Sequence, residues 1–342
     1  MPGERPATPS LREIAEAAGV SVATVSRALA GRGDLKRETR ERVQAIAHEL
    51  AYERPTSRRG RPATLDARLI ELVLGTFDDA WTNEVASGAR RRAFQRGYDL
   101  VLTLERDDPA DDWPARVATR RPSGVILGLI RPTTRQLDEL RGLRIPLVLF
   151  DPRSDPHGEL ASVGTTDWQG GYDAGAHLAA SGLRRFIVIT GIPRYRFGKA
   201  REEGFRTAVA ELADGAPVTR LDAAWTDADV TAPLRRFFAE DRTPTGVFAS
   251  NDEMALAVYR AAERLGLKIP EDVSVIGFND EPRAAAVEPP LTSVRQPVGE
   301  MAARAVDLVR ELRDRDLDHF ERVELPTRLI VRASTLPVPS DL

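Results

Sequence analysis

Cysteine is absent from this 342-residue chain, so disulfides, thiolate catalysis and thiolate metal sites are excluded. The four histidines include no H-x-x-x-H pair, and no metal site or cofactor is expected. No apolar run approaches the length of a membrane-spanning helix, and the amino terminus lacks the apolar segment of a signal peptide. We therefore expect a cytoplasmic protein that does not contact a membrane.

Sequence signatures of enzymes are missing as well. The chain contains no nucleophile elbow, P-loop, H-E-x-x-H or kinase motif. Asp78 and Asp79 are adjacent carboxylates, but nothing supplies a partner acid for them. We expect a binding protein and no enzymatic activity.

The charge is divided unevenly along the chain. Residues 1–62 carry 12 Lys and Arg against 8 Asp and Glu, which gives +4, whereas the remaining residues carry 37 against 44, which gives −7. A basic amino-terminal segment on an acidic body is typical of a nucleic-acid-binding head joined to another domain. The length of the chain is sufficient for two or three domains with substantial cores.

Residues 10–52 have the pattern of a three-helix unit that contains a helix-turn-helix. Ser10 can open a capping box, after which apolar residues recur at helical spacing. Gly19 stands where a first helix would end in a left-handed conformation, and Ser21 is a good N-cap for a second helix that runs to about Ala30. Because only a few residues separate the two helices, they must cross at a steep angle, as in a DNA-reading helix-turn-helix.

The second helix has an outer surface that suits DNA. Val22 and Ala23 are outward apolar residues that fit thymine methyl groups better than water, and Arg27 can make a bidentate contact to guanine. Phosphate oxygens are expected to accept hydrogen bonds from the hydroxyl groups near the start of this helix, namely Ser21, Thr24 and Ser26. The alternative is a three-helix bundle that binds a protein, and the segment alone leaves it open.

Residues 52–65 (YERPTSRRGRPATL) mark a domain boundary, because two prolines, a glycine and four arginines disfavour a stable helix. Arg59 and Arg61 belong to an Arg-Gly-Arg-Pro sequence that resembles the core of AT-hook motifs and is narrow enough to enter an A·T-rich minor groove. The alternative is a flexible basic tether that only neutralises phosphates.

Beyond residue 66 the sequence alternates between strand-like apolar runs and helical segments, which indicates parallel sheets that are covered on both faces. The pattern restarts near residue 168, so we expect two α/β lobes with a cleft between them. Strands are expected at residues 69–76, 98–104, 123–130, 145–150, 185–190, 217–222, 246–250 and 273–278. Helices are expected at residues 83–96, 110–120, 133–141, 168–181, 200–212, 228–240 and 254–265.

Ligands of open α/β sheets bind at the carboxyl ends of strands. Many of the predicted strands are followed by polar and aromatic side chains, which suit a sugar, because aromatic faces stack on C–H groups while carboxylates and amides pair with hydroxyls. For Asp252 and Asp280, a helix cap or another structural role is as good an explanation. The residues expected to bind the ligand are Asp78, Trp81, Asp151, Arg201, Trp225, Asn251 and Asn279.

Over nearly its full length the chain resembles the lactose-repressor (LacI/GalR) family of bacterial transcription regulators. The most specific stretches are IAEAAGVSVATVSRAL, FASNDEMALAV, IPEDVSVIGFND, PPLTSVRQP and LPTRLIVRAST. The resemblance implies a small all-α helix-turn-helix head and a two-lobed α/β core with parallel sheets, similar to periplasmic sugar-binding proteins. It also implies homodimers that bind near-palindromic double-stranded operator DNA under the control of a small-molecule effector, here expected to be a carbohydrate.

We accordingly expect a sequence-specific transcriptional regulator that acts as a repressor, and a sugar-binding protein without a DNA function is the alternative. The expected domains are a head at residues 1–54, a linker or hinge at 55–66 and a core at 67–338. Within the core, the N-lobe is expected at about 67–166 and 297–325, and the C-lobe at about 167–291 and 326–338.

Three features of the chain depart from the family pattern. The hinge pattern A-x-x-L is absent from residues 56–65, and the arm at residues 59–62 is its candidate substitute. Lys36 replaces the usual Ser N-cap of the third helix. Asn279 stands where many sugar-binding members have Asp.

The resemblance matches the base-reading positions to Val22, Ala23 and Arg27, and the phosphate contacts to Ser21, Thr24 and Ser26. It matches the effector-binding positions to Arg201 and Trp225, and the family's Asn-Asp pair after a core strand to Asn251 and Asp252.

Overall fold

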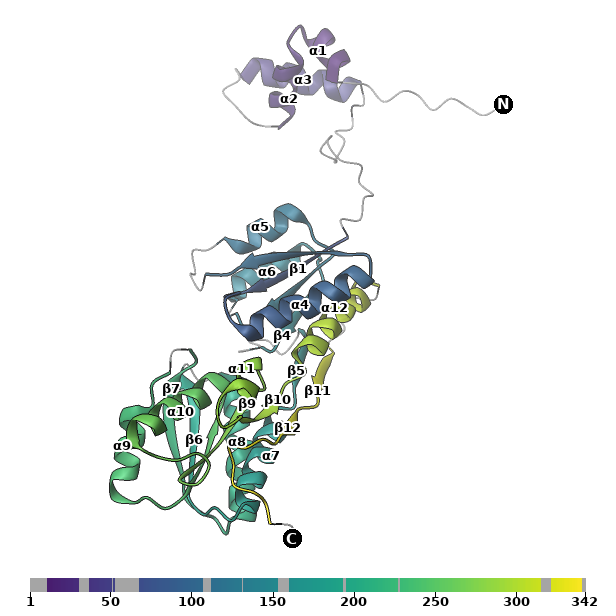
Figure 1. The fold of residues 1–342 in the computed structure, drawn as a ribbon. Coiled ribbons are helices and arrows are strands. Elements are labelled where there is room, and N and C mark those ends of the chain that lie inside the picture. Colours follow the sequence, from purple (N-terminus) through teal and green to yellow (C-terminus); the bar gives the residue numbers. More distant parts are fainter. Residues whose placement is uncertain are drawn as a thin grey trace. The chain divides into compact units, whose positions relative to one another are not determined.

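The structure is a computed structural model of the chain (Figure 1). It forms two compact units, Met1–Leu65 and Asp66–Leu342, which we call the head and the core. Within the ranges that the structure describes, no helix combines the length and the apolar character needed to cross a membrane. These described ranges are residues 11–30, 37–50, 52, 68–106, 112–130, 132–152, 160–192, 195–226, 228–314 and 321–339.

Among the described residues of the head, three short helices form a bundle. Gly19 follows the first helix with φ +63°, a conformation that glycine adopts without steric cost, as predicted. The Ser21 hydroxyl accepts a hydrogen bond from the Thr24 N–H (3.2 Å) and so caps the second helix, also as predicted. A small core forms around Ile14 and Val25. The helices are α1 (Leu11–Ala18), α2 (Val22–Ala30) and α3 (Arg37–Glu49).

The N-lobe of the core contains a six-stranded parallel sheet with the order β11-β5-β4-β3-β1-β2. Alternate side chains of its central strand face opposite sides: Leu72 packs against α4 and α12, and Val73 packs against α5 and α6. The elements are β1 (Leu69–Leu74), α4 (Ala80–Gln95), β2 (Asp99–Leu104), α5 (Trp113–Arg120), β3 (Gly124–Gly128), α6 (Thr134–Gly142), β4 (Leu147–Phe150), β5 (Ala161–Thr165), α12 (Val298–Asp314) and β11 (Arg322–Leu325).

The C-lobe repeats this arrangement in a sheet with the order β12-β10-β9-β8-β6-β7, parallel except for the β10–β12 pair. Ile187 faces α9 and α10, and Val188 faces α7 and α8. The elements are α7 (Asp167–Ala180), β6 (Phe186–Ile192), α8 (Arg196–Leu212), β7 (Val218–Ala224), α9 (Thr231–Glu240), β8 (Thr245–Ala249), α10 (Asp252–Leu265), β9 (Val273–Asn279), α11 (Pro282–Ala286), β10 (Thr292–Arg295) and β12 (Arg328–Ile330).

Three segments of the chain pass between the lobes, after β5, β10 and β11 (Figure 1). Two of them are joined side by side. The Thr327 N–H donates to the Thr166 hydroxyl (2.9 Å), and the Thr166 N–H donates to the Leu325 carbonyl (3.0 Å). These bonds hold the first and third crossing segments in a fixed register.

Helices α7 and α8 approach closely because glycines line their contact. A Cβ atom at Gly204 would lie 1.9 Å from the Trp168 carbonyl oxygen, and one at Gly171 would lie 2.1 Å from the Arg201 carbonyl oxygen. Any larger residue would force the helices apart. This close approach brings the start of α7 next to the first turns of α8, where the candidate ligand site lies.

The predicted fold class, a helix-turn-helix head on a two-lobed core with parallel sheets, is confirmed. Helices α4 and α8 begin three and four residues earlier than predicted. Helix α4 begins at Ala80 because the Asp79 carboxylate accepts from the Thr82 N–H (2.7 Å), and α8 begins at Arg196. The sequence patterns missed β5, which contains no continuous apolar run, and the elements that follow Asn279. Among these, β10, β11, β12 and α11 are short, whereas α12 is a 17-residue helix with apolar residues at helical spacing that were not read.

Candidate functional site

The start of α2 is the candidate DNA-reading surface of the head. Val22 is 44% exposed, a large value for an apolar side chain next to a small core. The Ser21 and Thr24 hydroxyls lie 2.9 Å apart at the amino terminus of the helix, where N–H groups without helical partners favour an anion. The remaining predicted DNA contacts have side chains or whole residues outside the described part: Ala23, Ser26, Arg27, Arg59 and Arg61, together with the capping residue Ser10.

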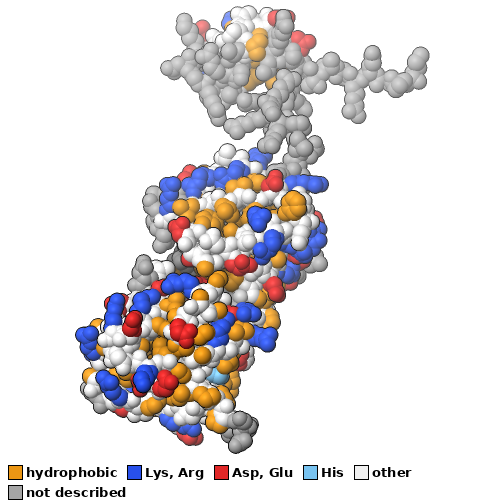
Figure 2. Space-filling view, in the orientation of Figure 1, with side chains coloured by type: hydrophobic (Ala, Val, Ile, Leu, Met, Phe, Trp, Pro, Cys, Tyr) orange, Lys and Arg blue, Asp and Glu red, His pale blue; other side chains and the backbone are white. Residues whose placement is uncertain are grey.

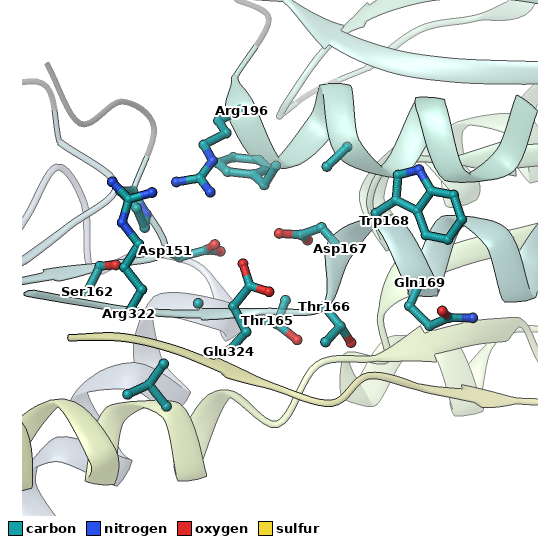
Figure 3. A pocket seen from close by; sticks show the side chains of 15 residues that line it. Asp151, Ser162, Thr165, Thr166, Asp167, Trp168, Gln169, Arg196, Arg322 and Glu324 are labelled. Atoms are coloured by element: carbon teal, nitrogen blue, oxygen red, sulfur yellow. The ribbon is translucent and has the colours of Figure 1, made fainter. Parts of the chain in front are cut away.

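Cavity I, of about 400 Å³, lies between the two lobes of the core. It is placed there by the ends of parallel strands: Asp151 directly follows β4, Asp167 begins α7 just after β5, and Arg196 begins α8 after β6. Figure 3 shows the Asp151 and Asp167 carboxyl groups pointing toward one another, with Arg196 nearby. Other lining residues include Ser162, Trp168, Gln169, Phe197, Arg322 and Glu324.

Arg201 supports cavity I from behind. Its side chain is buried, and its guanidinium donates to the Asp167 carboxylate and to the Ser250 carbonyl oxygen, both at 2.7 Å. The same guanidinium lies 3.6 Å from the centre of the Phe278 ring. With these partners Arg201 orients Asp167, and it does not itself line cavity I. The residue predicted to contact the ligand directly is thus placed one layer behind the surface.

Asp151 connects cavity I to a buried polar chain. The Gln296 side-chain amide donates to Asp151 (3.2 Å) and accepts from the Trp81 indole N–H (2.7 Å). Burial raises the pKa of Asp151 to about 7, and the charge of Asp167 adds to the rise, while Arg201 and Gln296 oppose it. These two hydrogen bonds therefore link the wall of cavity I to α4 through Gln296, which belongs to the second crossing segment.

Cavity II, of about 560 Å³, contains two more of the predicted residues. Trp81 lines it from α4, and Asn279 lines it from the end of β9, with φ +108°. The Asn279 amide donates to Glu281 (3.3 Å). The structure therefore divides the predicted ligand residues between two cavities, with Asp151 in cavity I and Trp81 and Asn279 in cavity II.

The other predicted ligand residues have structural partners. The Trp225 indole stacks on Tyr195 (ring centroids 5.5 Å apart) and meets the edge of Phe197 (5.1 Å), a residue that lines cavity I. Asn251 caps α10 by accepting from the Met254 N–H (2.8 Å) and donates to the Trp225 carbonyl (2.9 Å). Asp78 is exposed, and its N–H donates to the Thr76 hydroxyl in a turn before α4.

Asp252 and Asp280, for which the sequence allows a structural role as well as a ligand contact, bond to segments of the C-lobe. Asp252 is buried and accepts from the Ser293 hydroxyl (2.6 Å) and the Glu281 N–H (2.7 Å). Burial raises its pKa to about 8. Asp280 accepts from Arg295 (2.7 Å), at the end of β10. These contacts fix the segments that lead to the second crossing.

Sequence reasoning missed several residues that line cavity I. Asp167 was missed because β5 (ASVGT) contains no continuous apolar run, so nothing marked a strand end before it. Phe197 lies in the first turn of α8, and that helix was expected to begin at residue 200. Arg322 and Glu324 belong to β11, a short strand far along the chain that returns beside β5. Only the pairing of distant strands could reveal them.

The head and the bilobed core define a class of protein: a DNA-binding unit attached to a ligand-binding body. A model described as bacterial regulatory proteins, lacI family, matches residues 10–55, and a periplasmic binding protein-like domain model matches residues 176–335. The HTH-type transcriptional regulator MalR of Streptomyces coelicolor is 32% identical over 347 residues, which cover 98% of this chain and 98% of that protein.

Solved structures agree with these matches. The transcriptional regulator CelR in complex with cellobiose has a TM-score of 0.69 and 28% identity, covering 95% of this chain and 99% of that one. A Lac repressor dimer bound to operator and an anti-inducer shares the fold, with a TM-score of 0.67 and 22% identity over 97% of this chain and all of the other. The protein belongs to the LacI family and is a DNA-binding transcriptional regulator.

The buried Asp151 carboxyl group predicts a pH-dependent stability of the core. Because the native state keeps a proton that the unfolded chain releases, the free energy of unfolding should fall as the pH rises from about 4 to the folded-state pKa of about 7. Asp151→Asn removes the charge but keeps an oxygen for Gln296. We expect this variant to exceed the wild type in stability in mildly alkaline buffer, by at most about 4 kcal/mol.

Urea denaturation in acidic and alkaline buffer measures this difference, with tryptophan fluorescence as the signal because all four tryptophans belong to the core unit. The control is Asp78→Asn, which neutralises an exposed carboxylate. Equal pH dependence in the wild type and in Asp151→Asn would show that Asp151 is charged in the folded core.

Proposed function

We propose that this protein is a transcriptional repressor whose operator affinity is set by a carbohydrate bound between the core lobes. The observation that carries the proposal is the combination of two features in one chain. One is the capped α2 with Val22 exposed beside its amino terminus. The other is cavity I, with opposed carboxyl groups and an arginine at the ends of parallel strands.

The head is proposed to read DNA through α2. The exposed Val22 side chain next to Ser21 and Thr24 places an apolar group beside two hydroxyl donors, which suits a thymine methyl group beside a phosphate. Arg27, one turn further along α2, is proposed to contact a guanine. A ligand-binding protein without a DNA function is disfavoured by the family match over residues 10–55.

The effector is proposed to be a sugar. Carboxyl groups accept from hydroxyls, the Arg196 guanidinium donates to ring or hydroxyl oxygens, and the Phe197 ring offers an apolar face for C–H groups. A cavity of about 400 Å³ accommodates a small carbohydrate. The related regulator CelR was solved with cellobiose, which supports this chemical class.

Homodimers are proposed to form through the N-lobe. Strand β2 is an edge of the sheet, and Leu102 (49%) and Leu104 (43%) are exposed on it. Phe94, on the neighbouring helix α4, is 83% exposed. An exposed edge strand with apolar side chains is a site of association between chains. Dimers would present two heads to the two halves of a near-palindromic operator.

Control of DNA binding is proposed to operate through the crossing segments. A ligand in cavity I would contact Asp151, which Gln296 links to Trp81 at the start of α4. A change in lobe closure would therefore move α4 and the surface beside β2. The effector can change operator affinity only by as much as it prefers one closure state over the other.

The base-reading role is tested with Arg27→Ala. In fluorescence anisotropy with an operator taken from the DNA upstream of its own gene, we expect a loss of about 1–3 kcal/mol. Replacing the contacted guanine should weaken the wild type and leave the variant unchanged. Arg42→Ala, which removes an exposed arginine of α3, is the control. An equal loss on every duplex would assign Arg27 to the phosphates instead.

The effector class is tested with Arg196→Ala, which removes an exposed cation from the wall of cavity I. A panel of monosaccharides, disaccharides and sugar phosphates is screened by thermal shift and titrated by tryptophan fluorescence. Loss of a charged hydrogen bond should weaken the bound sugar about tenfold or more. Lys199→Ala, on the same helix but outside the cavity lining, should bind normally. No response of the wild type to any carbohydrate would refute the sugar proposal.

The dimer is tested with Leu102→Asp, which places a charge in the proposed interface. Sedimentation velocity should show the wild type at twice the chain mass of 37.6 kDa and the variant at the chain mass. Leu212→Asp is the matched control, because Leu212 has the same exposed fraction (49%) but lies at the end of α8. A dimer that survives Leu102→Asp would place the interface elsewhere.

A further inference from the structure

Three arginines stand at the entries to strands of the N-lobe sheet. Arg68 precedes β1, Arg121 lies in the turn before β3, and Arg144 lies in the turn before β4. All three are exposed. Because the strands of a parallel sheet begin at the same edge, these residues share the amino edge of the sheet. We call this set the arginine rim.

The backbone of the arginine rim has an unusual conformation. The φ angles are +41° at Arg68, +48° at Arg121 and +54° at Arg144. This left-handed region is disfavoured for residues with a Cβ atom and free of cost for glycine. At the entry to β2 the same region is occupied by Gly97, with φ +73°. Arginine at the other three strand entries therefore makes the folded state less stable than glycine would, and such sites indicate a role for the side chain.

Helix capping accounts for the backbone but not for the side chains. The Arg121 N–H donates to the Val117 carbonyl at the end of α5, and the Arg144 N–H donates to the Arg141 carbonyl at the end of α6. Glycine would make the same bonds at lower cost. A cation near a helix carboxyl end stabilises it only modestly when it is exposed to solvent.

The amino edge of the sheet is also the edge to which the head is joined. Arg68 is the residue immediately before β1, and residues 53–67 lie between it and Tyr52, the last described residue of the head. A stretch of that length spans at most about 50 Å, which limits how far the head, and a duplex that it holds, can lie from the start of β1. Residues 53–67 themselves contain four arginines and two acidic residues.

The charge near the rim is basic. Figure 2 shows arginine side chains gathered over the N-lobe near α5. Arg96 is not counted in the rim, because it is the C-cap residue of α4 and Gly97 holds the left-handed position before β2. Asp99, at the start of β2, is an exposed carboxylate at the same edge. A row of exposed guanidinium groups on a tethered body suits the regularly spaced phosphates of a duplex.

We propose that the arginine rim of the core binds the phosphate backbone of the same duplex that the head reads. The contact is independent of base sequence and adds affinity to operator and non-specific DNA alike. The inference rests on the proposed DNA-reading function of the head and extends the DNA-binding surface to the core.

The test compares the wild type and three double variants of the protein in their binding to operator and to random duplex over a range of salt concentrations. The double variant Arg121→Gly, Arg144→Gly removes two cations and relieves two left-handed residues. We expect its thermal midpoint to equal or exceed that of the wild type. The slope of log affinity against log salt should shrink by about 0.9 for each phosphate that the variant no longer neutralises. Affinity near 0.1 M salt should fall roughly tenfold or more on both duplexes.

The charge-conserving variant Arg121→Lys, Arg144→Lys should retain most of the slope. The matched control is Arg235→Ala, Arg236→Ala, which removes two exposed arginines from α9 in the C-lobe and should leave the slope unchanged. If the glycine variant keeps the wild-type salt slope and its operator preference, the rim proposal alone is overturned. The arginines would then be candidates for binding a protein partner. A wild type without operator preference would overturn the proposed function as well.

Discussion

The buried ion pair between Arg201 and Asp167 is the interaction on which the core depends. Removing two charges from water is unfavourable unless both are well partnered, and Arg201 meets this condition with a carboxylate, a carbonyl oxygen and an aromatic face. Through these contacts α8 is tied to α7, to the end of β8 and to β9. The pair is possible only because glycines let the two helices approach closely.

The same interaction positions the wall of cavity I. Asp167 is held toward Asp151 by Arg201, whose guanidinium is fixed by its other contacts, and the two carboxyl groups point toward one another (Figure 3). Burial raises the pKa of Asp151 to about 7, and its carboxyl group accepts a hydrogen bond from Gln296. Burial also raises the pKa of Asp167, against the opposing effect of Arg201, so a proton on either carboxyl group would let the cavity wall donate as well as accept hydrogen bonds.

The periodic parts of the sequence were the most predictable. Apolar runs such as residues 145–150 became central strands because both faces of a parallel sheet are buried, and Gly19 and Ser21 placed the ends of α1 and α2 through local backbone chemistry. Strand β5 and the segments beyond Asn279 escaped prediction because their stability comes from distant partners. β11 pairs with β5, and α12 packs on α4, across more than half the core sequence.

The sequence by itself determined the class of the protein, because the helix-turn-helix and the alternating α/β pattern are local signals that can be recognised within short stretches of the sequence. The tertiary structure alone decided which polar residues line a cavity and which support it. Arg201, Trp225 and Asn251 follow strands in the sequence as Asp151 does, yet their partners are protein groups. The physical reason is that residue type and strand position limit what a side chain can bind, whereas burial and packing between distant segments select its partner.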